Sequence, residues 1–376
     1  MLRMTDIAAK AGVSQSTVSF VLNGRETSVR ISESTRQRVL AAAEELGYRS
    51  NHLARAVRTG NTNMLGFIGG DLCEEHVGRM LDGALAEAEK QGFTLKILPH
   101  RDHENGYEHI IRRSSELRLT GVAALHLPVE MLEMIRAETK HCNHAMVLLD
   151  TPADLPGVPQ VVTDDERGVF LAIEHLVALG HTRIALISSD PIASIAVLRE
   201  QAFHHAMSHL GLEVPEKWVT RGDFRWREPS LQAAQALLDG PASERPTAIF
   251  CIGDLIACVT IQVAQELGLR VPRDVSVVGF GDSRLARFIV PTLTTLRQPF
   301  WEMGQRAVRC LIAQAGMPSG EPVDAQSDTC SATLPVELIE RSSTSHPLDD
   351  HQFSHSRRDK LQFAPDEALR PPLVTV

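Results

Sequence analysis

Hydrophobic positions near the N-terminus follow the period of two short helices separated by a turn. The inward positions expected are Ile7, Ala8 and Ala11 in the first helix and Val18, Val21 and Leu22 in the second. Gly12 lies between them, where a left-handed backbone can end the first helix. Thr5 and Ser14 are the expected caps, because their hydroxyls can accept hydrogen bonds from free first-turn amides. The pattern predicts a helical pair joined by a tight turn.

A third helix is predicted over residues 32–46, again from the spacing of its apolar positions. Its expected inward positions are Val39, Leu40, Ala43 and Leu46. The second helix keeps a short, polar and uncharged outward face at Gln15, Ser16 and Ser19. Such a face suits hydrogen bonds to base edges and phosphates in the major groove. We therefore expect the three helices to form a DNA-reading head.

From residue 63 onward, short apolar strands alternate with amphipathic helices. The expected strands are 65–69, 94–98, 121–125, 145–150, 183–188, 248–252 and 275–280, and the clearest helices are 80–92, 168–180 and 255–268. Such alternation predicts parallel sheets with helices on both faces. There are two such sets, with a joint near residues 162–165 and a return near residues 290–295. The fold class is therefore α/β behind an all-α head.

Charge is distributed unevenly along the 376 residues, whose net charge is −9. Residues 1–60 contain nine Arg or Lys and five Asp or Glu, a net of +4, so the remainder carries −13. A small basic head on an acidic body fits DNA binding through the head alone. No apolar run is long enough for a membrane span and no apolar signal core is present, so we expect a cytoplasmic protein. The six cysteines are scattered, and we expect free thiols.

Residues 4–24, 31–40, 45–48 and 51–55 together closely resemble the headpiece of the LacI/GalR family of bacterial transcription regulators. The resemblance continues to about Arg341. It implies a sequence-specific repressor that binds double-stranded operator DNA as a homodimer. It also implies a two-lobed core like that of periplasmic sugar-binding proteins, with a small-molecule effector, a sugar or sugar derivative, between the lobes. No leucine heptad follows the core, which favours a dimer over a tetramer.

The resemblance implies four regions. They are a helix-turn-helix headpiece at 1–48, a hinge helix at 49–61, an effector-binding and dimerisation core at 62–341, and a tail at 342–376. We expect an N-lobe of residues 62–163 and 292–325 and a C-lobe of residues 164–291 and 326–341. The tail is polar and without sustained periodicity, so we expect it to be disordered.

The DNA contacts that the resemblance implies come from the headpiece and the hinge. They are Thr5, Ser14, Gln15, Ser16, Thr17, Ser19, Phe20, Asn23, Arg25, Tyr48, Asn51, His52, Ala54, Arg55 and Val57. Phe20 stands where the family often has an arginine that reads guanine, and it can make only apolar contacts. Val57 stands where a leucine usually wedges into the minor groove. These two departures affect the expected operator sequence, not DNA binding itself.

The effector contacts that the resemblance implies come from both lobes. They are Asp71, His76, Arg101, Asp150, Arg199, Phe224, Gly253, Asp254, Gly281 and Asp282. Arg199 matches an arginine that holds sugar hydroxyls or a carboxylate, and His76 replaces a stacking aromatic. Gly253 and Gly281 replace an Asn and an Asp, which removes two acceptors and is expected to enlarge the site for a bulkier effector or one with fewer hydroxyls.

Three other functions are compatible with parts of the chain. A cytoplasmic carbohydrate-binding protein would need no headpiece, and a repressor that acts without an effector would need no ligand site. An enzyme is the third, from the acidic residues at 164–166, but a charged loop at the lobe joint explains them better. Three histidine pairs lack the Cys or carboxylate pattern that completes a zinc site. We expect no enzymatic activity, no cofactor and no metal.

Overall fold

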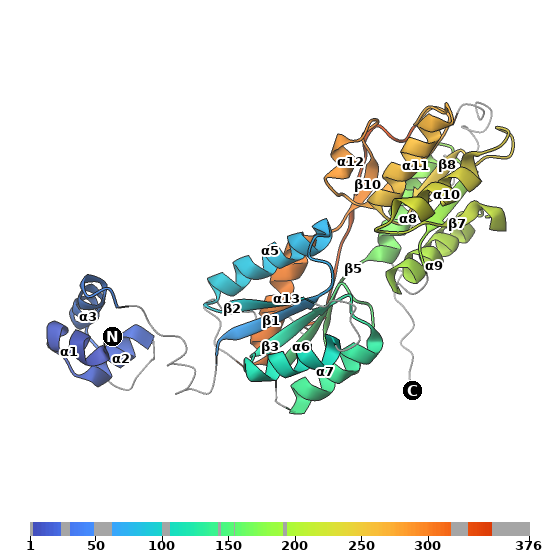
Figure 1. The fold of residues 1–376 in the computed structure, drawn as a ribbon. Coiled ribbons are helices and arrows are strands. Elements are labelled where there is room, and N and C mark those ends of the chain that lie inside the picture. Colours follow the sequence, from blue (N-terminus) through green and yellow to red (C-terminus); the bar gives the residue numbers. More distant parts are fainter. Residues whose placement is uncertain are drawn as a thin grey trace. The chain divides into compact units, whose positions relative to one another are not determined.

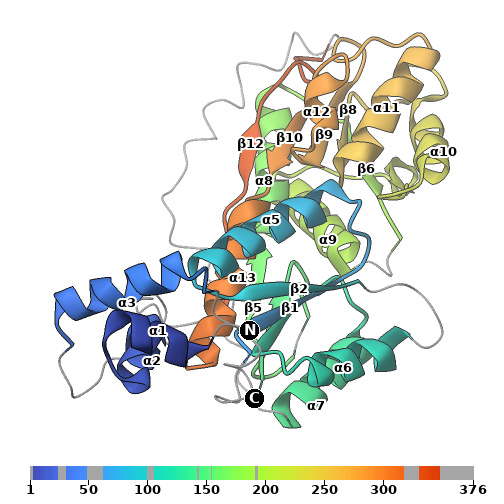
Figure 2. The same cartoon turned by 60° about the vertical axis from the view of Figure 1, so that its left-hand side comes forward.

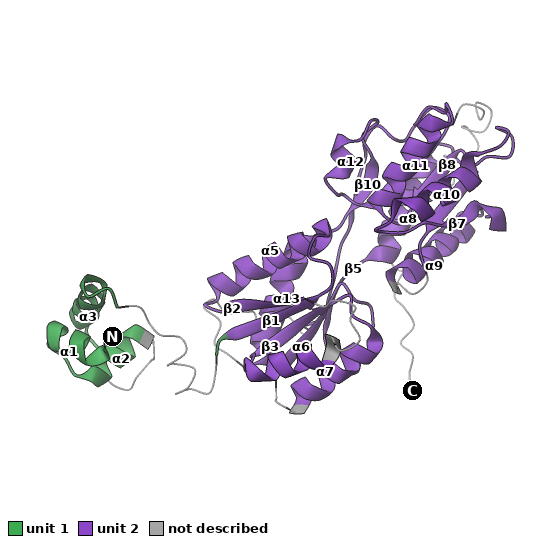
Figure 3. Cartoon of the chain, in the orientation of Figure 1, with its two compact units in different colours: residues 1–63 green, residues 64–376 purple. Residues whose placement is uncertain are grey.

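The computed structural model describes residues 3–23, 31–48, 62–99, 106–141, 144–153, 155–190, 194–316 and 330–347. The chain forms two compact units, residues 1–63 and residues 64–376 (Figure 3). The first contains the headpiece, and the second contains both sheets. None of the helices in the described ranges has the length and apolar character needed to cross a membrane.

The headpiece consists of α1 (Met4–Ala11), α2 (Gln15–Asn23) and α3 (Glu33–Glu45). The side chains that are fully buried at its centre are Ile7, Val18 and Val39. Gly12 ends α1 with φ of 66°, and the Ser14 hydroxyl accepts the Thr17 N–H at 3.1 Å at the start of α2. The predicted turn between the two helices is therefore present.

Two details of the headpiece prediction are wrong. Thr5 lies inside α1 and does not cap it, because the Asp6 carboxylate accepts the Arg3 N–H at 2.8 Å and holds the first turn. Leu40 is 48% exposed, while Ala42 is buried. The inward stripe of α3 passes through positions 39, 42 and 43. Position 40 is rotated by about 100° from position 39 around the helix axis, which turns Leu40 away from the core.

The N-lobe sheet has the strand order β11-β5-β4-β3-β1-β2, and its neighbouring strands all pair in parallel. Its strands are β1 (Met64–Gly69), β2 (Thr94–Pro99), β3 (Gly121–Leu125), β4 (Ala145–Leu149), β5 (Gln160–Thr163) and β11 (Ala332–Leu334). The helices of this lobe are α5 (Glu75–Lys90), α6 (Gly106–Glu116), α7 (Val129–His141) and α13 (Phe300–Gln314). Helices α5 and α13 cover one face, and α6 and α7 lie on the other (Figure 1).

The C-lobe sheet has the order β12-β10-β9-β8-β6-β7, parallel except for β12. Its strands are β6 (Ile184–Ser188), β7 (Val219–Arg221), β8 (Ala248–Cys251), β9 (Ser276–Gly281), β10 (Thr294–Arg297) and β12 (Glu337–Ile339). Its helices are α8 (Asp165–Ala178), α9 (Ser194–His209), the short η1 (Glu216–Trp218), α10 (Arg227–Leu238), α11 (Asp254–Glu266) and α12 (Leu285–Phe288). The predicted parallel α/β core is confirmed.

Within the described residues the chain crosses between the lobes three times, and two predicted lobe boundaries are wrong. β10 pairs with β9, so residues 294–297 belong to the C-lobe. β11 pairs with β5, so residues 332–334 belong to the N-lobe. The crossings follow β5, β10 and β11. Strands as short as three residues carry little periodicity, and their partners lie far away in the sequence, so their pairing decides the lobe.

Helices α5 and α13 lie side by side in both views of the molecule (Figures 1 and 2). A Cβ atom on Gly83 would lie 1.9 Å from the Trp301 carbonyl oxygen, and one on Gly304 would lie 1.9 Å from the Met80 carbonyl oxygen. Only glycine at both positions permits this approach. The contact holds the middle of α5 against the start of α13.

Residues 342–347 were expected to belong to a disordered tail, and this expectation is wrong. Ser343 is fully buried. Its hydroxyl donates to the Val277 carbonyl at 2.6 Å and accepts the Thr294 N–H at 2.8 Å. The segment is polar because it satisfies backbone groups of the C-lobe sheet, which is why apolar periodicity does not reveal it. Residues 348–376 lie outside the described residues.

Candidate DNA-binding face and effector site

The outward side of α2 presents the short polar side chains that the sequence predicts. Gln15 and Ser16 are exposed, and Ser19 and Phe20 are half-buried. Thr17 is half-buried, and its hydroxyl is 2.8 Å from that of Ser14. Gln15 and Ser16 are therefore the residues of this face that are best placed to reach a base edge.

Of the other predicted DNA contacts, the structure describes the side chains of Thr5 and Tyr48. Thr5 is exposed on α1, whereas Tyr48 is half-buried against the headpiece core. Asn23 ends α2, but its side chain is not described. The other predicted contacts lie outside the described residues: Arg25, Asn51, His52, Ala54, Arg55 and Val57.

The N-lobe part of the candidate effector site is a pair of histidines beside a buried aspartate. The His76 and His126 rings are 5.2 Å apart between centroids. His126 Nε2 lies 3.1 Å from an oxygen of Asp150. His126 and Asp150 follow β3 and β4 and have positive φ values of 50° and 47°. Non-glycine residues rarely adopt this backbone, and strain of this kind concentrates at functional sites.

Burial sets the ionisation of this group. Burial lowers the pKa of His76 to about 4, and the charges of His126 and Arg199 act in the same direction. His76 is therefore a neutral imidazole near neutral pH. Burial opposes ionisation of Asp150, but the hydrogen bond from His126 and the nearby positive charges lower the pKa of Asp150 below its ordinary value. The N-lobe side thus offers an ionised carboxylate beside a neutral imidazole.

Arg199 is the C-lobe residue whose positive charge lowers the pKa of both His76 and Asp150. Its Nε donates to Asp165 Oδ1 at 2.7 Å, and another of its nitrogens lies 2.6 Å from the same oxygen. A third nitrogen donates to the Ile252 carbonyl at 2.7 Å. The guanidinium carbon lies 3.7 Å from the centre of the Phe280 ring. Arg199 is 5% exposed and Asp165 4%, so the pair is buried and Arg199 is largely occupied by protein partners.

The lobe joint connects to this pair through buried polar side chains. The Gln298 amide donates to Thr163 Oγ1 at 3.0 Å, and Thr163 Oγ1 donates to Asp165 at 2.7 Å. Gln298 and Thr163 stand at two of the crossings. Burial raises the pKa of Asp165, while the Arg199 charge opposes that rise. The position of Arg199 is therefore tied to the crossings themselves.

A cavity of about 370 Å³ lies beside the same joint. Its lining includes Thr163, Asp165 and Thr333 at the joint and Leu198 and His205 on α9. The acidic residues at 164–166 start α8, where Asp164 accepts the Arg167 N–H at 3.0 Å. This is helix capping and requires no catalytic role.

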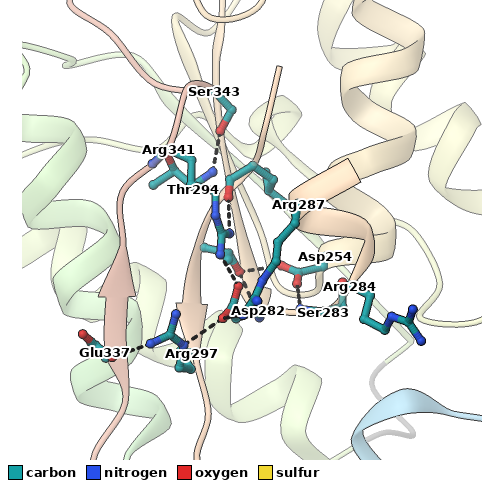
Figure 4. Close-up of polar contacts among 12 residues, drawn as sticks. Asp254, Asp282, Ser283, Arg284, Arg287, Thr294, Arg297, Glu337, Arg341 and Ser343 are labelled. Carbon is teal, nitrogen blue, oxygen red and sulfur yellow. Dashed lines mark hydrogen bonds and ion pairs between the residues drawn. The ribbon is translucent and has the colours of Figure 1, made fainter. Parts of the chain in front are cut away.

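Asp254 and Asp282 are bonded to protein groups rather than directed at open space (Figure 4). Asp254 accepts the Ser283 N–H at 2.6 Å and the Thr295 hydroxyl at 2.5 Å. Asp282 accepts from three arginines, Arg287 at 3.1 Å, Arg297 at 2.7 Å and Arg341 at 2.5 Å. Burial opposes ionisation of Asp282, but these arginines lower its pKa. Both carboxylates brace the C-lobe, and we do not assign them to an effector.

The two glycines do not simply enlarge the site. A Cβ atom on Gly253 would lie 2.9 Å from the Phe224 ring, so the ring already occupies the space that a side chain would need. Gly281 has φ of 134° and lies beside Asp254. The expectation of a wider site at Gly253 is therefore wrong, because the Phe224 ring fills the space that the missing side chain would have left.

The remaining predicted residues lie apart or are not described. Asp71 is exposed, and its carboxylate accepts the Cys73 N–H at 2.9 Å. Arg101 lies outside the described residues. His126 and Asp165 were not predicted. His126 directly follows a strand whose carboxyl end faces the ligand side of a parallel sheet, so its position offered a signal. Within the described ranges, no group of three His, Cys, Asp or Glu side chains could hold a metal ion.

A helix-turn-helix head followed by two parallel α/β lobes defines a DNA-binding transcription regulator with a core like that of periplasmic binding proteins. The profile described as "Bacterial regulatory proteins, lacI family" matches residues 3–51. The profile described as "Periplasmic binding protein-like domain" matches residues 173–344. The chain belongs to the lacI family of bacterial regulatory proteins.

Curated relatives agree with this assignment over most of their length. The chain is 34% identical over 350 residues to the HTH-type transcriptional regulator DegA of Bacillus subtilis (strain 168), across 92% of this chain and 98% of DegA. It is 31% identical over 314 residues to the HTH-type transcriptional repressor PurR of Aliivibrio fischeri (strain MJ11), across 83% of this chain and 91% of that protein. These relatives are regulators and not enzymes, which supports a non-enzymatic repressor.

Solved structures share the fold of both units. The lac repressor dimer bound to operator and the anti-inducer ONPF has a TM-score of 0.75 at 26% identity, covering 92% of this chain and 99% of that chain. The transcriptional regulator CelR, in complex with cellobiose, has a TM-score of 0.66 at 27% identity, covering 91% and 100%. The predicted family and fold class are confirmed.

Proposed function

We propose that the chain is a homodimeric repressor whose operator affinity is set by a small molecule held between the N-lobe and the C-lobe. The observation that carries this proposal is the His76–His126 pair of the N-lobe, 5.2 Å apart between ring centroids and hydrogen-bonded to Asp150, within range of the charge of Arg199 from the C-lobe. A ligand at this point would contact both lobes, so its affinity would depend on their relative angle. A ligand shifts an equilibrium only by such differential affinity.

The effector in this proposal is an uncharged polyhydroxy compound, carbohydrate in type. Asp150 is an ionised acceptor, and neutral His76 can donate or accept. Arg199 is already paired with Asp165, so its charge is not left over for a phosphate or carboxylate. The structure of CelR with cellobiose and that of the lac repressor with ONPG support a carbohydrate by similarity. His76, His126, Asp150, Arg199 and Phe224 are the contacts we propose.

The DNA contacts in this proposal come from the headpiece and the hinge. Gln15 and Ser16 would meet base edges in the major groove, with Thr17, Ser19 and Phe20 beside them. The positions at 51–57 would follow the minor groove. Polar side chains of this length form the direct base contacts that distinguish sequences, while basic residues contribute sequence-independent affinity.

A dimer is supported by apolar side chains on the surface near α12. Leu285 is 51% exposed, and Phe288 and Val290 are each 77% exposed. Three large apolar side chains this close together are unusual on a monomer surface and typical of a contact between subunits. The lac repressor structure with a similar fold is that of a dimer.

Two measurements on the full-length protein test the proposed function. Thermal unfolding is recorded with neutral sugars, polyols, sugar acids, sugar phosphates, nucleosides and purine bases. A ligand at about one hundred times its Kd stabilises the native state by about 2.7 kcal/mol. The hit is expected among neutral sugars or polyols and should be weakened in Asp150→Asn. Operator selection then identifies the DNA site, whose Kd the hit should change about 5- to 150-fold.

Each result has a defined reading. Stabilisation by sugar phosphates, sugar acids, nucleosides or purine bases alone would reject an uncharged effector of carbohydrate type. Operator binding with no stabilising compound in any class would favour a repressor that acts without an effector. No operator selected from random DNA would reject the repressor function itself.

A further inference from the structure

Away from the three crossings, the two lobes meet through a hydrogen bond between Glu75 and Arg284. The Arg284 backbone N–H donates to Glu75 Oε2 at 2.8 Å. Glu75 is the first residue of α5 in the N-lobe, and Arg284 precedes α12 in the C-lobe. The two residues are 209 positions apart in the sequence, so the bond depends entirely on how the lobes are placed.

The C-lobe end of this bond is rigidly held. The preceding residue, Ser283, donates its N–H to Asp254 at 2.6 Å. The residue before that, Asp282, has φ of 48° and is bonded to three arginines (Figure 4). The direction of the Arg284 N–H is therefore fixed by a braced loop rather than by the Arg284 side chain.

The N-lobe end is also held in place. Val77, two residues after Glu75, is buried, and α5 is fixed against α13 by the glycine contacts at Gly83 and Gly304. The backbone is therefore held at both ends, and only the Glu75 side chain can adjust when the lobes rotate. A hydrogen bond weakens steeply when its length grows by more than a few tenths of an ångström, so a rotation that exceeds the reach of the Glu75 side chain breaks it.

The bond also lies next to the proposed effector site. His76, the residue after Glu75, faces His126 across 5.2 Å. A ligand that contacts His76 therefore acts one residue from the bond. We propose that Glu75 is a positioning residue of the switch, whose hydrogen bond to the Arg284 N–H is made in one lobe arrangement and broken in the other. This proposal rests on the proposed function, because it concerns how the same effector site controls the lobes.

Hydrogen exchange of the Arg284 amide in the full-length protein tests the bond without any effector. In Glu75→Ala the amide should exchange about tenfold faster or more, because its acceptor is gone. Glu75→Gln keeps an amide oxygen as acceptor and should restore part of the protection. Glu89→Ala removes an exposed acid from the same helix and should exchange like the wild type. Unchanged Arg284 exchange in Glu75→Ala would overturn the proposal.

The role in switching is tested on the selected operator. Glu75→Ala should change the operator Kd about fivefold or more, with Glu75→Gln closer to wild type and Glu89→Ala unchanged. Faster Arg284 exchange with an unchanged operator Kd would reject the switch role and leave the proposed function intact. Absence of operator binding in the wild type would instead reject the proposed function, while the exchange result would still report on the bond.

Discussion

Gly83 of α5 lies so close to Trp301 of α13 that an added Cβ atom would be 1.9 Å from the Trp301 carbonyl oxygen. Gly83→Ala should therefore force the helices apart and lower the free energy of unfolding by about 1–3 kcal/mol or more. Gly78→Ala is the matched control on the same helix, since a Cβ there meets nothing within 4 Å. It should be neutral or stabilising by up to about 1 kcal/mol. Urea unfolding followed by circular dichroism measures both, and equal effects would contradict the tight contact.

Arg199→Ala should cost stability as well as any effector response. The change leaves Asp165 buried beside the joint without its cation, and breaking such a pair costs about 3–5 kcal/mol. Arg221→Ala is the control, because its ion pair with Glu200 is more exposed, at 47% and 20%, and exposed pairs are worth about 1 kcal/mol or less. Denaturant midpoints compare the two variants. A stable Arg199→Ala protein would mean that Asp165 finds another partner.

Mild acid should destabilise the core through His181. Burial lowers the pKa of His181 to about 4 in the folded protein, while an unfolded histidine titrates near about 6.5. Near neutral pH both forms are neutral. As the pH falls below about 6.5, only the unfolded chain binds the proton, so the free energy of unfolding decreases until the pH nears 4 or so.

Melting temperatures at about pH 7 and about pH 5 measure this loss. His181→Gln should show a smaller decrease than the wild type, whereas His204→Gln, at an exposed position, should not. The same decrease in all three proteins would assign the acid sensitivity to other groups. Burial also lowers the pKa of His76 to about 4, so some sensitivity should remain in His181→Gln.

Gln15→Ala combined with Ser16→Ala should reduce the preference for the operator over random DNA by about 1–3 kcal/mol for each lost base contact. Both side chains are exposed, so the melting temperature should not change. Gln37→Ala, on the exposed side of α3, is the control. Binding assays at several salt concentrations distinguish specific from non-specific affinity. A parallel loss of both would mean that these residues contact only phosphates or support the fold.

The headpiece and the order of the lobes could be predicted because both depend on local signals. Ser14 and Gly12 act where their chemistry predicts, and strands such as β3 and β4 are continuous apolar runs. The assignment of β10 and β11 to their lobes could not be predicted, because it depends on pairing with strands distant in the sequence. Leu40 was misplaced for a smaller reason, an error of one position in a helical stripe.

The residues expected at an effector site fall into two sets. His76, Asp150 and Arg199 lie within electrostatic range of one another, whereas Asp254 and Asp282 are bonded within the C-lobe. No sequence pattern reveals that Phe224 fills the space beside Gly253, because the two residues meet only in the folded lobe. The resemblance therefore predicts where a residue lies in the fold better than it predicts which groups its side chain contacts.

The strands β11 and β12 form an outer edge of each sheet although they lie among the last described residues of the chain. During synthesis the headpiece therefore emerges from the ribosome long before either sheet can be completed. Until then β5 and β10 present unpaired edges of the kind that promote aggregation. A chain that terminates prematurely, before residue 332, would carry a folded DNA-reading head on two unfinished sheets.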